Sequence, residues 1–392
     1  MSSSRPKLPA AVVALGVTSL LADVSSEMIA PVMPLFLTAT LGAGALQLGL
    51  IEGVGETTAS LIRLFSGRWS DRAERRKPWV IAGYAITAAT RPLLALAPVW
   101  QWVLGCRFLD RVGKGVRSAP RDALIADVVA PEQRGAAYGL HRAMDHTGAM
   151  LGPLAAALCL GLGAAPRAIF SLAFLPAVLA VLALYIGVRE PARAERITAR
   201  AIGPVPVTRR FDVIVLLIGL GLRALGTPAD MLLLLKLTQE HLSLTHVALV
   251  YAAYNGIRAL VSWQAGRLAD RLAPKTVALV GWISQAALLW VFAVVVTPLA
   301  AVAVYWFYAF ASGIAEPAEK SYVATLAPPE ARGRVFGWYN MTLGLVGVPS
   351  GLMIGLLWDL RGVTDALGVA SVLIASAAGL VFFTTRTATR RN

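Results

Sequence analysis

Residues 107–122, which read RFLDRVGKGVRSAPRD, concentrate ionisable side chains inside an apolar part of the chain. The stretch holds seven Asp, Lys or Arg residues, whereas charged residues make up only 15% of the whole sequence. Residues 92–106 before it carry no charge, and residues 123–126 after it are apolar again. At about 100° per residue, the seven charges fall within an arc of about 140° on a helix. Because a charge that faces lipid is costly, such a stripe must contact other polar groups or water.

Other segments also carry their ionisable residues on one helical face. These sets are Asp23 with Glu27; Glu52 with Glu56 and Arg63; and His141 with Arg142, Asp145 and His146. At about 1.5 Å per residue, Asp110 lies about 15 Å from the outer end of its segment, near the middle of a bilayer. The same arithmetic places further polar residues at similar depth, namely Asp23, Glu56, Asp145, His146, Arg223, Asn255 and Arg258.

A layer of charge at this depth could bind a substrate and a coupling proton. A carboxyl group there could take up and release a proton as its surroundings change, and an imidazole titrates near neutral pH. The proton-coupling candidates are therefore Asp23, Glu27, Glu56, Asp110, Asp145 and His146. Fixed donors for an anionic or zwitterionic substrate are Arg107, Arg111, Lys114, Arg142, Arg223, Asn255 and Arg258. The alternative is that some of these residues only hold helices together through ion pairs.

The composition places these residues in an integral membrane protein. Of the 392 residues, 57% are hydrophobic, and the mean hydropathy is +0.66. We expect twelve membrane-spanning helices, centred near residues 24, 56, 88, 112, 149, 177, 223, 255, 286, 312, 346 and 375. The first span contains Asp23 and Glu27 and lacks a small-residue cleavage site, so it does not resemble a cleavable signal peptide. Cys106 and Cys159 fall inside spans, where we expect them to pack without redox or metal roles.

The formal charge of +14 is distributed by loop. Alternate loops hold Arg68, Arg72, Arg75, Arg76 and Lys77; Arg134; the arginines of 189–210; Arg267, Arg271 and Lys275; and Arg332 and Arg334. The opposite loops hold almost no arginine or lysine. This is the positive-inside pattern, and it predicts cytoplasmic termini on a protein of the cytoplasmic (inner) membrane. The basic excess is therefore topological, and no nucleic-acid partner is expected.

The chain also repeats itself. GRWSDRAERRK from Gly67 recurs as GRLADRLAPK from Gly266, an offset of 199 residues, and PEQRGAAYG from Pro131 recurs as PEARGRVFG from Pro329, an offset of 198. The repeat predicts two six-helix bundles of the same orientation, at 1–188 and 211–392, joined by a cytoplasmic linker at 189–210. Parallel repeats of this kind, related by an axis along the membrane normal, are typical of transporters.

These motifs resemble those of the major facilitator superfamily. The sequence Gly67-x-x-x-Asp71-Arg72-x-x-Arg75-Arg76-Lys77 is similar to its loop 2-3 motif, with a weaker copy that contains Asp270 and Arg271. Arg107-x-Leu109-x-x-x-Gly113-x-Gly115 resembles the fourth-span motif of the drug/proton antiporters, and Gly148-x-x-x-Gly152-Pro153 resembles their fifth-span motif. Three positions depart from the family patterns, namely Glu74, Asp110-Arg111 and Ala156-Ala157, and the second adds two charges to the expected site.

The resemblance implies the all-α major facilitator fold and a set of gating residues. The loop motifs and Asp127, which is similar to the family's fourth-span partner, would close the cytoplasmic gate. The expected gating residues are Gly67, Asp71, Arg72, Arg76, Asp127, Gly148, Gly152, Pro153, Asp270 and Arg271. Because Gly113, Gly115, Gly148 and Gly152 follow no strand, we expect them to serve close helix packing and not nucleotide binding.

The expected function is proton-coupled secondary transport by alternating access, without a cofactor and without enzymatic activity. The motifs favour an efflux antiporter of small charged or amphiphilic molecules. The alternative is a proton-coupled importer of an organic anion or a metal chelate, such as a siderophore. His146 with Met28, Met33, Met144 and Met150 leaves a transition-metal carrier as a weaker alternative, although no metal site is expected. The expected partners are a small-molecule substrate, protons and the lipid bilayer, and we expect a monomer.

Overall fold

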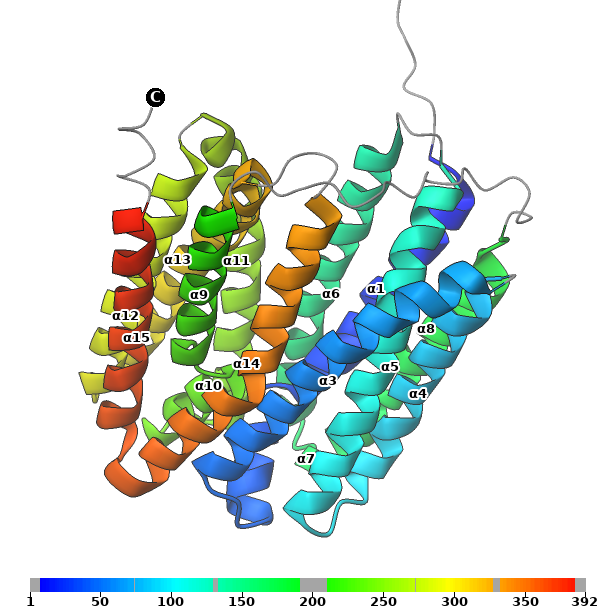
Figure 1. Cartoon of the computed structure of the whole chain (residues 1–392). Helices are drawn as coiled ribbons and strands as arrows, with labels where there is room; N and C mark the ends of the chain where they lie inside the picture. The colour runs from blue at the N-terminus through cyan, green and yellow to red at the C-terminus, as the bar shows by residue number, and fades with distance from the viewer. Residues whose placement is uncertain are drawn as a thin grey trace, which may run out of the picture. The chain divides into compact units, whose positions relative to one another are not determined.

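The computed structural model describes residues 8–73, 75–129, 133–190, 210–271, 273–326 and 332–384. Within these ranges the described side chains exclude those at 68, 71, 134, 135, 210, 263, 266–271, 332–334 and 384. The described residues form helices joined by turns and loops, and none of them forms a strand (Figure 1).

Two compact units divide the chain, and the long helix α3 (Ala45–Arg72) passes from one to the other. Unit 1 comprises residues 1–30 and 61–200, and unit 2 comprises residues 31–60 and 201–392. Besides its part of α3, unit 1 contains α1 (Ala10–Ile29), α4 (Lys77–Ala95), α5 (Trp100–Asp127), α6 (Arg134–Gly161), α7 (Pro166–Leu172) and α8 (Phe174–Gly187). The domain boundaries expected from the repeat stay a prediction.

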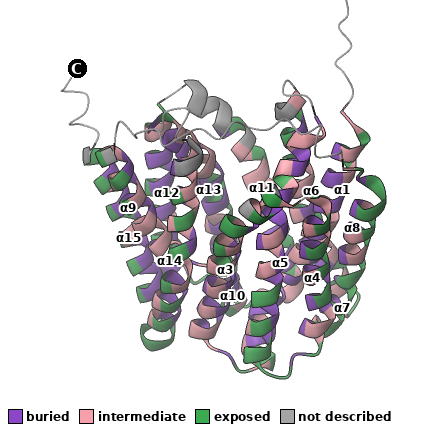
Figure 2. Ribbon diagram, turned by 45° about the vertical axis from the view of Figure 1, so that its right-hand side comes forward, coloured by how far each residue is buried: buried purple, intermediate pink, exposed green. Residues whose placement is uncertain are grey.

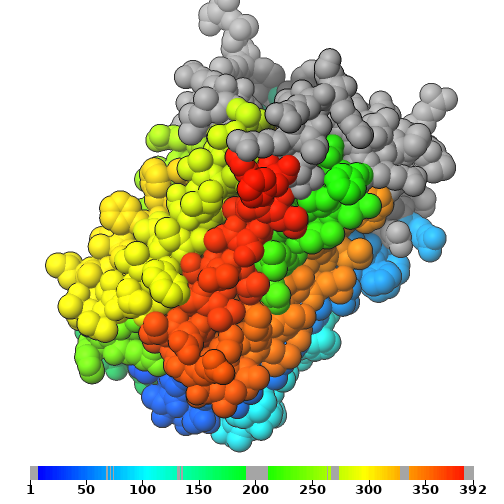
Figure 3. Space-filling model, turned by 60° about the vertical axis from the view of Figure 1, so that its left-hand side comes forward, coloured from blue at the N-terminus to red at the C-terminus, as the bar shows by residue number. Residues whose placement is uncertain are grey.

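Unit 2 contains the start of α3 and all helices after the linker. Its elements are α2 (Met33–Leu35), the short π-helix η1 (Phe36–Thr40), α9 (Arg210–Gly226), α10 (Asp230–Gln239), α11 (Leu244–Arg271), α12 (Pro274–Val294), α13 (Pro298–Leu326), α14 (Arg332–Arg361) and α15 (Val363–Thr384). Figure 3 shows α15 on one face of this unit, between α12 on one side and α9 and α14 on the other.

The expected spans agree with these helices. Each of the twelve expected centres falls inside a helix or a pair of consecutive helices. Among the described residues, seven helical segments are long and apolar enough to cross a membrane. The helices α3, α4, α5, α6 and α11 are not among them, and all five carry ionisable residues. The exposed side chains of α8 are apolar, as a lipid-facing surface requires, and include Leu175, Leu179, Leu182 and Ile186 (Figure 2).

Glycine sets the close approach of α1 and α6 in unit 1. A Cβ atom on Gly148 would lie 2.5 Å from the carbonyl oxygen of Leu20, and one on Gly152 would lie 2.7 Å from that of Val24. The helices α4 and α5 also pack closely, because a Cβ on Gly113 of α5 would lie 2.6 Å from the carbonyl oxygen of Gly83 of α4. The close packing predicted for Gly113, Gly148 and Gly152 is therefore confirmed.

Unit 2 joins the first sixteen residues of α3 to α14 in the same way. Gly49 faces Gly351 and Gly53 faces Gly347, so closely that a Cβ atom at any of them would overlap the opposing backbone or leave almost no clearance. The Thr57 hydroxyl donates to the carbonyl oxygen of Gly344 at 2.6 Å. At the end of this contact, small residues allow the Asp359 carboxylate to reach the first turn of α3.

Asp359 caps the N-terminus of α3 from another helix. Its Oδ1 accepts from the amide of Ala45 at 2.9 Å and its Oδ2 from the amide of Leu46 at 2.8 Å. These amides belong to the first turn of α3, which has no intrahelical partners and a partial positive charge. The turn that follows Asp359 uses Gly362, whose φ of 91° favours glycine. The sequence thus places a carboxylate and a tight turn where α14 ends.

We predict that Gly351→Val destabilises the folded protein. The added side chain must push α14 away from Gly49 and loosen the Asp359 cap, and overpacking of this kind costs about 1–3 kcal/mol. The thermal unfolding midpoint in detergent should fall clearly. The matched control is Gly379→Val on α15, where a Cβ would meet no atom within 4 Å. Equal midpoints for the two variants would contradict the role of the glycine contact.

Candidate functional site

Arg91 is a fully buried cation that joins three helices of unit 1. Its Nη2 lies 3.1 Å from Oδ1 of Asp110 on α5. Its Nε donates to the Ser25 hydroxyl at 3.1 Å and its Nη2 to the Ser26 hydroxyl at 2.9 Å, both on α1. A second guanidinium, that of Arg107, lies 3.9 Å from Asp110 Oδ2. Asp110 is thus held between two arginines in a water-poor interior.

Further along the ionisable stripe of α5, Arg117 is a buried cation whose contacts are with neutral groups. Arg117, which is 5% exposed, donates to the Thr87 hydroxyl at 2.7 Å and lies 4.3 Å from the centre of the Tyr84 ring. Among the described residues, no carboxylate oxygen lies at ion-pair distance from Arg117. Four arginines, namely Arg91, Arg107, Arg111 and Arg117, lie within electrostatic range of Asp110. Positive charge therefore exceeds negative charge along this part of α5.

The exposed side of α5 is apolar, as the predicted stripe requires. Phe108 and Leu109 are each 45% exposed, and at about 100° per residue they lie outside the arc of the charges. Lower on the helix, Arg121 donates to the Ser19 hydroxyl at 3.2 Å and pairs with Asp122 at 3.0 Å. The helix therefore turns its charges toward α1 and α4 and its apolar side outward.

Carboxylates gather where α1 and α6 meet. Asp23 lies within electrostatic range of Asp145, Glu27 and Lys114. The Nδ1 atom of His141, on α6, lies 3.4 Å from Oδ2 of Asp145, and Arg142 reaches the same oxygen at 3.9 Å. The structure thus brings together three of the predicted proton-coupling residues, Asp23, Glu27 and Asp145. Carboxylates that share a site titrate as a coupled group.

The loop before α4 contains an ion pair expected from the sequence. Arg76 Nη1 lies 2.9 Å from Asp127 Oδ2 at the end of α5. The amides of Arg76 and Lys77 also donate to the Glu190 carboxylate, at 2.5 and 3.0 Å, which caps the N-terminus of α4. Lys77 in turn donates to the carbonyl oxygen of Val188 at 2.7 Å. The structure thus brings the Arg76 and Asp127 side chains together, while their gating role stays a prediction.

Unit 2 holds a buried network around Arg223 of α9. Its Nη1 pairs with Oε2 of Glu319 at 3.1 Å, and its Nη2 donates to Gln285 at 3.1 Å. Glu319 is 2% exposed and also accepts from the Trp282 indole at 3.1 Å and from the Tyr339 hydroxyl at 2.7 Å. Four helices, α9, α12, α13 and α14, thus fix the position of one guanidinium.

A second charged group in unit 2 is only partly buried. Oε2 of Glu316 on α13 accepts from Arg258 of α11 at 2.8 Å, and its Oε1 accepts from Lys320 at 2.7 Å. These three side chains are between 36% and 41% exposed. Asn255 lies one helical turn before Arg258, and its buried Nδ2 has no hydrogen-bond partner in the described structure. We call Arg258, Glu316 and Lys320 the α11–α13 triad.

The remaining predicted residues are placed as follows. Glu56 is exposed on the part of α3 that belongs to unit 2, and His146 is half-buried on α6. Arg111 and Lys114 are half-buried on α5, Arg142 is exposed, Arg72 is exposed, and Gly67 packs against Ala119. Pro153 lies within α6, one residue after Gly152. The side chains of Asp71, Asp270 and Arg271 lie outside the described set.

Sequence reasoning missed several residues that the structure places in these networks. Arg91, Arg117, Gln285, Glu316, Glu319 and Lys320 were not among the candidates. Arg91 is a single arginine in an otherwise uncharged stretch. Glu316, Glu319 and Lys320 lie inside one expected span, in a segment of five residues. An ionisable residue inside a membrane segment is itself a functional signal, and it could have identified them.

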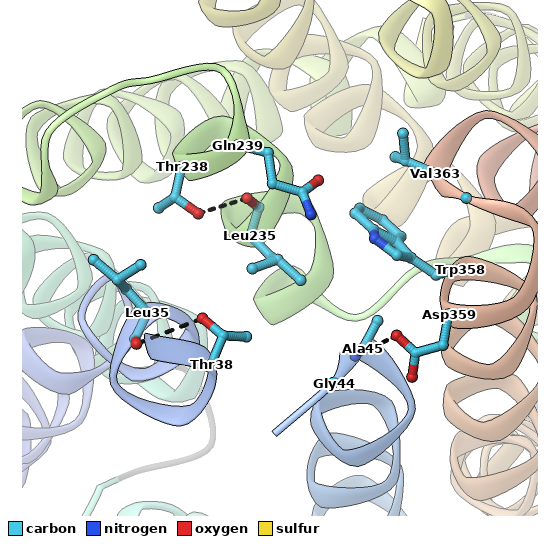
Figure 4. A pocket seen from close by; sticks show the side chains of 11 residues that line it. Leu35, Thr38, Gly44, Ala45, Leu235, Thr238, Gln239, Trp358, Asp359 and Val363 are labelled. Atoms are coloured by element: carbon cyan, nitrogen blue, oxygen red, sulfur yellow. Dashed lines mark hydrogen bonds between the residues drawn. The ribbon is translucent and has the colours of Figure 1, made fainter. Parts of the chain in front are cut away.

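A hollow of about 550 Å³ opens in unit 2 beside the cap of α3 (Figure 4). It is lined by Leu35, Thr38, Gly44, Ala45, Leu235, Thr238, Gln239, Trp358, Asp359, Gly362 and Val363. Both oxygens of Asp359 already accept amides of α3. The hollow therefore offers hydroxyl, amide and indole groups, and its lining carboxylate is engaged.

Apolar helices that are long enough to cross a bilayer define a multi-pass membrane protein, and each of its two units contains a charged network. The sequence pattern of the Major Facilitator Superfamily matches residues 15–352. The chain belongs to this superfamily, and it is a transporter of small molecules and not an enzyme.

Relatives with similar sequences cover nearly the whole chain. An MFS-type transporter of Methanocaldococcus jannaschii is 28% identical over 375 residues, which cover 94% of this chain and 93% of the relative. An uncharacterised protein of Mycobacterium tuberculosis is 32% identical over 373 residues, covering 92% and 90%. The multidrug resistance protein MdtH of Yersinia pestis is 33% identical over 115 residues, which are 29% of this chain and 28% of MdtH.

Solved structures share the fold. A bacterial homologue of the human lysosomal transporter Spinster, in an inward-facing and unoccupied conformation, superposes with a TM-score of 0.80 at 16% identity, and the match covers 96% of each chain. The human organic anion transporter MFSD10 gives a TM-score of 0.70 at 17% identity, with 96% of this chain and 100% of MFSD10 covered. At these identities the likeness extends to the fold alone, which is the predicted major facilitator fold.

We predict that Arg91→Gln destabilises the protein strongly. The variant leaves the buried Asp110 carboxylate without its nearest cation, and breaking a buried pair costs about 3–5 kcal/mol. The measurement is thermal unfolding of the purified protein in detergent. The matched control is Arg142→Gln, because the Arg142 side chain is 67% exposed and lies 3.9 Å from Asp145. Similar midpoints for both variants would show that the Arg91 pair does not hold unit 1 together.

Proposed function

We propose that this protein is a proton-coupled secondary transporter of small organic anions that works by alternating access. The observation that carries the proposal is the excess of buried cations along α5. Arg91 of α4 and Arg107 and Arg117 of α5 are all buried and lie within electrostatic range of Asp110. Arg117 also lies within electrostatic range of Asp23. Arg117 is satisfied by a hydroxyl and an aromatic ring.

Buried cations in excess favour an anionic solute. Removing a guanidinium from water is costly, and neutral partners offset this cost only in part. A carboxylate or phosphate on a solute would supply the missing negative charge, and the planar guanidinium binds such groups through two hydrogen bonds. A cationic solute would add to the positive charge of this region. The likeness of fold to an organic anion transporter is compatible with this substrate class.

The carboxylates of α1 and α6 support coupling to protons. Asp23 lies within electrostatic range of Glu27, Asp145 and Lys114. A group of acids beside a base can exchange a proton when substrate or conformation changes their surroundings. The proton gradient would then serve as the energy source, across the cytoplasmic membrane and with both termini on the cytoplasmic side.

A second candidate is an efflux antiporter of charged or amphiphilic molecules. It is favoured by the 115-residue match to MdtH, whose name gives multidrug resistance as its role. Export and import use the same fold and differ in the gradient that drives the cycle. Anion transport with protons remains the better-supported proposal, because it follows from residues that the structure brings together.

We predict that Arg117→Gln impairs transport of organic anions. Purified protein in proteoliposomes should carry radiolabelled lactate, benzoate or succinate, and the variant should raise the apparent KM at least about tenfold, because a charged hydrogen bond contributes about 1.5–3 kcal/mol. The control is Arg361→Gln, an exposed arginine at the end of α14. The proposal of an anionic substrate fails if wild-type protein transports none of the three probes.

We further predict that neutral amides remove the response to a pH gradient. The variants are Asp23→Asn, Glu56→Gln and Asp110→Asn, and at least one should keep substrate exchange while losing gradient-driven accumulation. Asp365→Asn, at the exposed start of α15, should behave as wild type. Gradient-driven transport that is unchanged in all three variants would rule out these residues as the coupling groups.

A further inference from the structure

The α11–α13 triad combines two cations with one carboxylate. Arg258 Nη2 binds Oε2 of Glu316 at 2.8 Å, while Lys320 Nζ binds Oε1 at 2.7 Å. Each oxygen therefore serves one cation, and the group carries one net positive charge when all three residues are ionised. An anion added to the triad would balance its charge.

Water, and not lipid, must reach the triad. Arg258, Glu316 and Lys320 are between 36% and 41% exposed. At about 100° per residue, Glu316 lies about 180° from Phe307 and about 120° from Phe310, which are exposed aromatic residues of α13. Arg258 likewise lies about 180° from Leu249 and about 160° from Leu260, which are exposed on α11. The triad therefore faces away from the apolar surfaces of both helices.

The middle of α11 supports solute binding by its position. Arg258 is the fifteenth of the 28 residues of α11, so about 20 Å of helix extends from it toward each end. Charges halfway along a membrane helix, and open to water, are typical of a solute pathway. Structural pairs at the helix ends, such as Arg76 with Asp127, lack this feature.

Two buried hydrogen-bond donors of unit 2 lack a partner among the described residues. The Nδ2 of Asn255 is buried and lacks a partner among the described residues, and so does Nε of Arg223. Asn255 precedes Arg258 by three residues, so the two side chains lie about 60° apart on α11. Tyr308 lies within electrostatic range of both Arg223 and Arg258, which places the two arginines in one region of unit 2. Donors without acceptors favour a ligand that carries acceptor oxygens.

We propose that Arg258, Lys320 and Asn255 form a binding site for the carboxylate group of an organic anion, and that Glu316 is the resident counter-ion which the anion displaces. The proposal rests on the proposed function, since it takes the substrate class argued from α5 and adds a carboxylate-binding site in unit 2. A ligand carboxylate has the same two oxygens as Glu316 and can bind both cations in its place. Asn255 would donate to the ligand and so favour it over Glu316.

The test compares carboxylate binding to variants of the purified full-length protein in detergent. Lactate, benzoate and succinate are titrated by calorimetry. Glu316→Gln removes the competing carboxylate and should tighten binding about tenfold, whereas Arg258→Gln and Lys320→Gln should each weaken it at least about tenfold. The matched control is Glu240→Gln, because Glu240, at the C-cap of α10 in the same unit, pairs with Lys236 at 2.8 Å. Its affinity should equal that of wild type.

The outcomes separate this inference from the proposed function. A gain of affinity in Glu316→Gln cannot arise from misfolding, so it supports the site even if the other variants unfold. Carboxylate binding that is lost in Arg117→Gln but unchanged in all three triad variants would overturn the site and leave the proposed function in place. If no probe binds and none is transported by wild-type protein, the proposed function and this site are both wrong.

Discussion

The cost of placing charge in the interior of a membrane protein governs the structure of each unit. In unit 1 the buried Arg91 reaches a carboxylate and two serine hydroxyls on neighbouring helices. In unit 2 the buried Glu319 reaches a guanidinium, an indole and a phenol. Each of these contacts spans several helices, so the helices can take only a few relative positions without leaving a charge unmatched. Charge neutralisation thus contributes to the specificity of helix packing as well as to the site.

Helices must also approach closely enough for short side chains to reach one another. Gly148 and Gly152 let α6 touch α1 at the level where Asp23 and Glu27 extend from α1. Gly49 and Gly351 bring α3 against α14, and Asp359 can then cap the first turn of α3. In both units a glycine contact and a carboxylate occur together. Removing side-chain bulk at one position therefore determines which polar contacts are possible at another.

Hydropathy predicted the fold well, because a helix that crosses a bilayer needs a long apolar segment whatever its neighbours are. The α5 stripe was also predictable, since seven charges on one face can be recognised without knowledge of any partner. Partners were not predictable. Arg91 is a single arginine near the end of an apolar helix, and nothing in the sequence indicates that Asp110 will face it. Glu316 and Glu319 lie three residues apart, yet Glu316 is open to water and Glu319 is buried.

The duplicated sequence shows how one scaffold accommodates two chemistries. At the offset of 199 residues that relates Gly67 to Gly266, Arg117 corresponds to Glu316 and Arg121 corresponds to Lys320. Both pairs occupy the later part of the corresponding helices, α5 and α13. Arg117 of the first half contacts a hydroxyl and an aromatic ring. Its counterpart Glu316 is a carboxylate that binds two cations. Because the helical position is kept while the charge is reversed, the repeat preserves where a polar group enters the bundle, and the residue type at that position sets which solute groups it can bind.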